Sequence, residues 1–190
     1  MNIFAIEGDL KTGKIDWIAS GKSQDNYRVV KMILESCQIL STVLNEQGVD
    51  APYRPFNPKH PSCLWAAESA QNFRDLITHC ASMIDEYEER FGKTHKCKAV
   101  LKKIVQLFDA SRFPQEESTP LRQAMPEDMK HDNPVIAYRK FYASKPRVRY
   151  PKDKIPYWFP VLRGTQKFDI VESKNQGKRT SSSTIQGVVG

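Results

Sequence analysis

The segment from Ser23 to Gly48 constrains the fold of this chain more than any other. Its apolar residues recur at intervals of three and four, which places them on one face of an α-helix. Ser23 or Asp25 can cap the start of this helix, and Gly48 offers a left-handed stop at its end. The apolar face consists of Val29, Val30, Ile33, Leu34, Cys37, Leu40 and Leu44. The pattern predicts one long amphipathic helix that lies against the core.

Three further segments have the same helical periodicity. They span residues 62–91, 94–111 and 134–144, and the first of them can be read with a break after Trp65. Thr94 is a natural N-cap for the second segment, and Asp132 or Asn133 is one for the third. The chain is therefore predicted to be mainly α-helical.

Proline-rich stretches separate the helices. Four prolines between residues 49 and 61 forbid regular structure, so this segment is expected to be an extended connector. Residues 2–7 fit either a short strand or an apolar arm on the core. We expect a compact single-domain helical fold over residues 1–170 with long proline-rich loops, followed by a flexible polar tail over residues 171–190.

Composition narrows the classes of protein and partner. The chain has no apolar run near the eighteen or so residues of a membrane span, and its start lacks the basic and apolar regions of an export signal. Its cysteines, Cys37, Cys63, Cys80 and Cys97, form no C-x-x-C pair that would indicate a zinc or redox site. We expect no membrane partner, no metal site and a cytoplasmic location.

The net charge of +7 favours a polyanionic partner. Basic residues gather with aromatic ones in residues 138–154, where Arg139, Lys140, Arg147 and Arg149 are candidate ligands for DNA phosphates. Some of the interleaved tyrosines are ordinary core residues in this interpretation, and the remainder suit base stacking. The composition therefore favours double-stranded DNA as the partner.

A second basic cluster lies at residues 89–98, which we call the elbow. Gly92 ends one predicted helix and Thr94 starts the next, so backbone N–H groups at a helix N-terminus lie beside cationic side chains. These side chains belong to Arg90, Lys93, His95 and Lys96. The elbow is predicted to bind a phosphate or pyrophosphate; the alternative is that its lysines only balance the acidic turn before it.

Three sequence motifs carry a resemblance to known proteins. "NYRVVKMILES", "KHPSCLWAAESAQNF" and "EYEERFGKTHK" occur in an order and spacing that resemble a family of uncharacterised bacteriophage proteins. More distantly, the chain is similar to the helical pyrimidine-dimer DNA glycosylases. This resemblance implies a helical domain that kinks duplex DNA, extrudes a nucleotide and works in the cytoplasm of an infected bacterial host.

The catalytic residues of those glycosylases are only partly matched. The family attacks the sugar with the α-amine of a threonine that removal of the first methionine exposes, whereas this chain has Asn2. Where the family's helix glutamate is expected, this chain has Tyr27 or Arg28, and the nearest acid is Glu35, two turns further on. Lys31 matches a basic residue that holds DNA.

These residues suggest three classes of function. The first is a transferase that attaches an amino acid or another amine to pyrophosphorylated 5-hydroxymethyluracil in DNA, with a cationic pocket for the leaving group and one base. The second is a glycosylase and abasic-site lyase, and the third is a non-catalytic DNA-binding protein. The candidate catalytic residues are Arg28, Lys31, Glu35, His60 and His95, and Tyr27 joins the candidate DNA ligands. No cofactor is expected beyond Mg²⁺ carried by the substrate pyrophosphate.

Overall fold

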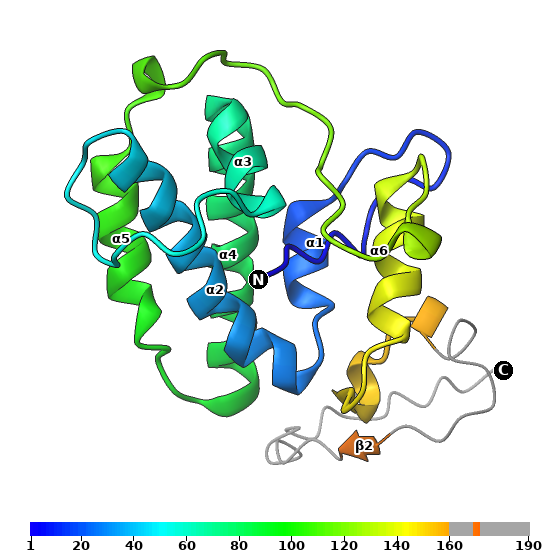
Figure 1. Ribbon diagram of the computed structural model, residues 1–190. Helices are drawn as coiled ribbons and strands as arrows, with labels where there is room; N and C mark the ends of the chain where they lie inside the picture. Colours follow the sequence, from blue (N-terminus) through cyan, green and yellow to red (C-terminus); the bar gives the residue numbers. More distant parts are fainter. Residues whose placement is uncertain (160–168, 172–190) are drawn as a thin grey trace, which may run out of the picture.

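The computed structural model describes residues 1–159 and 169–171, and six α-helices dominate these residues (Figure 1). The prediction of a compact, mainly α fold is confirmed, while the likeness to the glycosylases stays a prediction. The helices are α1 (Trp17–Lys22), α2 (Asn26–Glu46), α3 (Pro61–Glu68), α4 (Ala70–Phe91), α5 (Cys97–Leu107) and α6 (Pro134–Ala143). The strands are β1 (Arg149–Pro151) and β2 (Asp169–Val171), which pair in parallel. Short 3-10 helices span Ala110–Arg112, Glu127–Met129 and Lys152–Lys154.

Helix α4 is the centre of the helical layer. It packs against α1, α2, α3 and α5, and α2 lies beside it (Figure 1). Most of the predicted apolar face of α2 is buried, but Val30 and Leu34, which were predicted to belong to that face, are exposed. The Asp25 side chain accepts the N–H of Tyr27 at the start of α2. Gly92 ends α4 with φ 61°, a left-handed conformation that costs glycine little.

Three boundaries differ from the sequence prediction. Helix α1 was not predicted, because six residues with an internal Gly21 show too little periodicity. The predicted segment 62–91 divides at Ser69, whose extended backbone ends α3 and whose hydroxyl caps α4. Helix α5 spans Cys97–Leu107 rather than residues 94–111, because the His95 ring accepts the N–H of Cys97 at 3.1 Å and the backbone is extended at Phe108.

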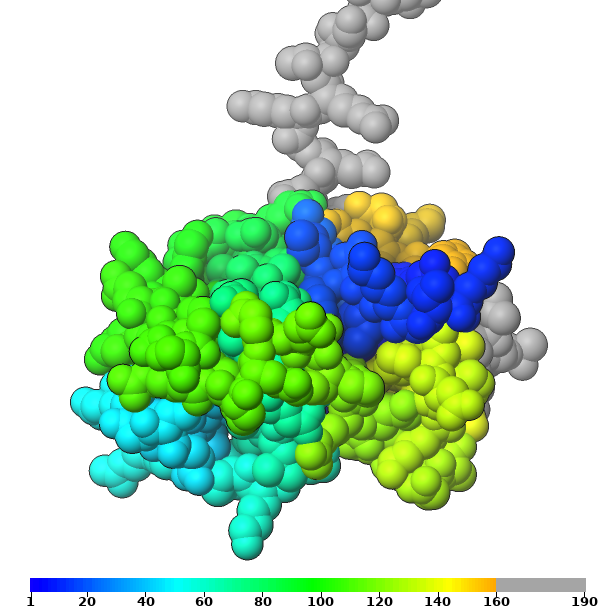
Figure 2. Space-filling model, turned by 90° about the horizontal axis from the view of Figure 1, so that it is seen from above, coloured from blue at the N-terminus to red at the C-terminus, as the bar shows by residue number. Residues whose placement is uncertain are grey.

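The first six residues form a buried arm rather than a strand. Ile3, Phe4, Ala5 and Ile6 are all buried, and the Phe4 ring meets the Tyr142 ring of α6 edge-on at 5.0 Å. The arm runs between the helical layer and α6 (Figure 1). In Figure 2 the blue surface of the first part of the chain lies between green and yellow surfaces. This position brings Met1 to the surface of α2.

Most buried apolar residues between Ile3 and Phe159 form one contiguous core cluster. Tyr150, Trp158 and Phe159 extend this cluster beyond α6 through edge-on ring contacts. The expected polar tail at 171–190 lies outside the described residues, apart from Val171 at the end of β2. None of the helices in the described ranges is both long and apolar enough to cross a membrane.

Candidate functional site

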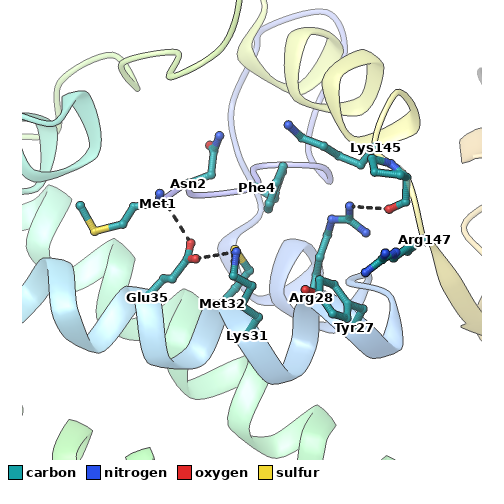
Figure 3. Close-up of a pocket in the computed structure, with 11 residues that line it drawn as sticks. Met1, Asn2, Phe4, Tyr27, Arg28, Lys31, Met32, Glu35, Lys145 and Arg147 are labelled. Carbon is teal, nitrogen blue, oxygen red and sulfur yellow. Dashed lines mark hydrogen bonds and ion pairs between the residues drawn. The ribbon is translucent and has the colours of Figure 1, made fainter.

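A cavity of about 510 Å³ opens where the N-terminal arm, α2 and the segment after α6 meet (Figure 3). We call it the N-terminal pocket. In this pocket, side chains of the N-terminal arm and of residues 145–147 lie next to one face of α2. The pocket is lined by Met1, Asn2, Phe4, Tyr27, Arg28, Lys31, Met32, Glu35, Lys145, Pro146 and Arg147.

Helix α2 contributes the largest share of the pocket. Tyr27, Lys31 and Glu35 follow one another at intervals of four, so their side chains lie above one another on one helix face. Arg28 and Met32 flank that row. The helix therefore brings together three of the five predicted catalytic residues, Arg28, Lys31 and Glu35.

Buried contacts fix the Arg28 guanidinium. Its Nη1 donates to Asp25 Oδ2 at 2.6 Å, and its Nη2 donates to the carbonyl of Pro146 at 3.3 Å. The guanidinium carbon lies 4.8 Å from the centre of the Tyr142 ring, whose hydroxyl donates to the same Asp25 oxygen at 2.5 Å. Asp25 is fully buried, so the Arg28–Asp25 ion pair holds the guanidinium rigidly at the pocket wall.

Glu35 is the only acidic side chain among the described residues that line the pocket. It is 9% exposed, and its carboxylate lies 3.0 Å from Lys31 Nζ and 3.9 Å from the α-amine of Met1 (Figure 3). The helix position of Glu35 is two turns beyond the one where the resemblance led us to expect a glutamate. The structure nevertheless brings a carboxylate next to an amine.

Lys145 and Arg147 complete the pocket from the segment after α6. Burial, together with the positive charges of Arg28 and Lys31, lowers the pKa of Lys145, whose ammonium lies 3.5 Å from the centre of the Phe141 ring. Arg147 has φ 55°, a left-handed conformation uncommon for a residue with a side chain. Lys145 was not among the predicted site residues, since no local pattern connects it to α2.

The two predicted catalytic histidines both accept a backbone N–H at the start of a helix. His60 Nδ1 accepts the N–H of Ser62 at 3.1 Å and so caps α3, near the pocket but not among its lining residues. Burial first, and then the charge of the Met1 amine, lowers the pKa of His60. His95 lies away from the N-terminal pocket, and its Nδ1 accepts the N–H of Cys97, the first residue of α5. Burial lowers its pKa as well.

A larger groove of about 900 Å³ lies on the other side of Tyr27 and Lys31, which line both hollows. We call it the tyrosine groove. The elbow forms one of its walls. Three of the four elbow residues that were predicted to bind phosphate or pyrophosphate line it, namely Lys93, His95 and Lys96.

Two arginines that were predicted to bind phosphate form ion pairs with carboxylates instead. The Arg90 side chain is 3% exposed and its Nε lies 2.6 Å from Glu86 Oε1. The Arg139 side chain is 6% exposed, pairs with Glu7 at 2.7 Å and donates to the carbonyl of Ile6. Both guanidinium groups hold the fold together, and we leave them out of the phosphate-binding set.

Two further predicted phosphate ligands of the C-terminal stretch, Lys140 and Arg149, lie at the surface. Lys140 is exposed and donates to the carbonyl of Asp128, and Arg149 is exposed on β1. Neither lines the N-terminal pocket or the tyrosine groove. Across residues 1–159, no three His, Cys, Asp or Glu side chains gather in a way that could ligate a metal ion.

Comparisons with known proteins leave the site to be interpreted from its own chemistry. No family model, no curated protein and no solved structure matches this chain.

Proposed function

We propose that this protein is a DNA-base-modifying transferase whose active site is the N-terminal pocket. The observation that supports this function is the composition of one cavity: among the described residues that line it are four cationic side chains, a single carboxylate and two aromatic rings. The cations are Arg28, Lys31, Lys145 and Arg147, and the rings are those of Phe4 and Tyr27. A base that carries a pyrophosphate group has the matching chemistry, since its ring is flat and its leaving group is strongly anionic.

The reaction proposed is a substitution at the exocyclic methylene carbon of the activated base. The amine nitrogen of the donor forms a bond to this carbon while the carbon–oxygen bond to pyrophosphate breaks, and the electron pair leaves with the oxygen. Lys145 and Arg147 stabilise the departing charge, and Arg28, whose charge is paired with Asp25, forms the rigid wall beside them. Glu35 accepts the proton that the donor amine loses, and the ion pair with Lys31 holds the Glu35 carboxylate in position.

The substrate is double-stranded DNA from which the target base has been extruded, because a base inside the stack cannot reach a pocket. The donor is an amino acid or another small amine. No resident cofactor is needed for the substitution, and Mg²⁺ would arrive with the substrate pyrophosphate. The resemblance to bacteriophage proteins assigns the reaction to the cytoplasm of an infected bacterium.

A second candidate function is base excision, and the contact between the Met1 α-amine and Glu35 favours it. In this reaction the amine attacks the sugar C1′, the base leaves with the glycosidic electron pair, and an imine forms as the sugar ring opens. Glu35 would then take the C2′ proton that is lost when the 3′ phosphate is eliminated.

One experiment separates these chemistries. The protein is incubated with mixed amino acids and three duplexes, which are ultraviolet-irradiated, contain 5-hydroxymethyluracil, or contain its pyrophosphorylated form. Mass spectrometry of the nucleosides should reveal a heavier thymidine adduct in the third duplex only. Base loss in the first duplex, with borohydride trapping of the protein on DNA, would support excision. Binding without any covalent change would indicate the third class, a non-catalytic DNA-binding protein.

A further inference from the structure

The tyrosine groove differs from the N-terminal pocket in having no carboxylate at all among the described residues that line it. Its walls come from α2, from the end of α4 with the elbow, and from the connector before α3. They present three tyrosines and three lysines to one hollow. These are Tyr27, Lys31, Tyr53, Tyr87, Lys93 and Lys96.

Of the three lysines of this groove, Lys31 pairs with Glu35, whereas the two elbow lysines have no such partner among the described residues. In the described part of the chain, no carboxylate lies within ion-pair distance of the exposed Lys93 and Lys96. The neighbouring acids at the end of α4 are already engaged, because Glu88 pairs with Lys98 and Glu89 pairs with Lys154. The two elbow lysines are therefore available to an anionic ligand.

Tyr27 and Lys31 form a ridge between the groove and the N-terminal pocket. Both residues line both hollows, and Tyr27 is 51% exposed at the crest. A strand that places one base in the pocket can continue across this ridge into the groove. Aromatic rings beside lysines are the combination that binds single-stranded nucleotides through base stacking and phosphate contacts.

We infer that the tyrosine groove is a second nucleotide subsite, which holds the nucleotide flanking the modified base on the same DNA strand. Tyr53 and Tyr87 provide the stacking surface, Lys93 and Lys96 bind the backbone phosphates, and Tyr27 separates the two bases. This inference rests on the proposed function only in that the reacting base occupies the N-terminal pocket.

Binding of unmodified DNA tests the subsite without any turnover. The ligand is a fluorescent duplex with a short unpaired bubble, and affinity is measured from low to moderate salt concentration. The double variant Lys93→Ala/Lys96→Ala should bind more weakly, and its salt slope should be shallower by about 1.5, since each phosphate contact contributes about 0.7 to 0.9. The matched control Lys102→Ala/Lys103→Ala removes the same charge from exposed positions on α5 that do not line the groove.

The position of the nucleotide is tested by photocrosslinking. 5-Iodouracil is placed in turn at the target position and at each flanking position, and mass spectrometry identifies the crosslinked residue. The subsite predicts crosslinks to Tyr53 or Tyr87 from one flanking position. Equal salt slopes in the two double variants, or crosslinks from flanking positions only outside the groove, would overturn the inference. Because neither assay requires catalysis, a chain that binds in this way but modifies no base would refute only the proposed function.

Discussion

Acid should destabilise this protein through one buried histidine, His79 of α4. Its side chain is buried against α1, its Nδ1 lies 3.2 Å from the carbonyl oxygen of Trp17, and its Nε2 has no hydrogen-bond partner among the described residues. Burial lowers the pKa of His79 from 6.5 to about 4. The folded state therefore keeps the ring neutral over a pH range in which the unfolded chain takes up a proton.

The direction and magnitude of the change in the free energy of unfolding with pH follow from this pKa shift. Above pH 6.5 neither state binds the proton, so the stability contribution is complete there. As the pH falls towards 4, the unfolded state gains protons first and the free energy of unfolding decreases. A shift of this size corresponds to about 3 kcal/mol. That loss is a large fraction of the stability of an ordinary domain.

Urea unfolding at a series of pH values between 7 and 4 measures this effect. The variant His79→Phe should lose less stability than the wild type over this range, by about 3 kcal/mol. The control Leu76→Ala removes a buried side chain from the same helix, so it should lower stability by about 2 to 5 kcal/mol at every pH while keeping the wild-type pH dependence. An unchanged pH dependence in His79→Phe would refute the reasoning.

Three further predictions concern the site and its supports. Glu35→Gln should lower the rate of base modification by about 10² to 10⁴, and Glu46→Gln, an exposed position on the same helix, should leave it unchanged in the same nucleoside assay. Arg139→Ala leaves buried acceptors unpaired and should cost about 3 to 5 kcal/mol in urea unfolding, whereas Lys140→Ala at the surface should cost under about 1 kcal/mol. Gly21→Ala would place a methyl group 1.9 Å from a side-chain oxygen of α4 and should cost about 1 to 3 kcal/mol, and a wild-type melting temperature would contradict this.

The long helices were predictable because their apolar residues repeat over many turns. Residues 26–46 and 134–143 are helical as expected, and Asn133 caps the second of these helices with its side chain. Helix α1 escaped prediction because its stability comes from packing on α4 rather than from its own sequence. The start of α5 also depends on one ring-to-backbone contact that no periodicity reveals.

The candidate site was predictable only where it lies on one element. Arg28, Lys31 and Glu35 share a helix face, so their spacing is enough to bring them together. Lys145 joins them through the tertiary fold, across more than a hundred residues of chain. The place of Lys145 in the site could therefore be found only from the structure.

The same limit explains the two arginines that proved to be structural. Arg139 stands in a basic stretch of sequence, but its partner Glu7 is 132 residues away. This pair is buried because the N-terminal arm packs against α6. The pattern of charges along the sequence does not reveal such a contact.

The most direct test of the proposed function is nucleoside mass spectrometry on duplex DNA that carries pyrophosphorylated 5-hydroxymethyluracil, with wild-type protein and Glu35→Gln compared in the presence of mixed amino acids. A heavier thymidine adduct with the wild type, reduced at least about a hundredfold in the variant, is the predicted result. Unchanged nucleosides with the wild-type protein, under conditions where it binds the duplex, would contradict the proposed function.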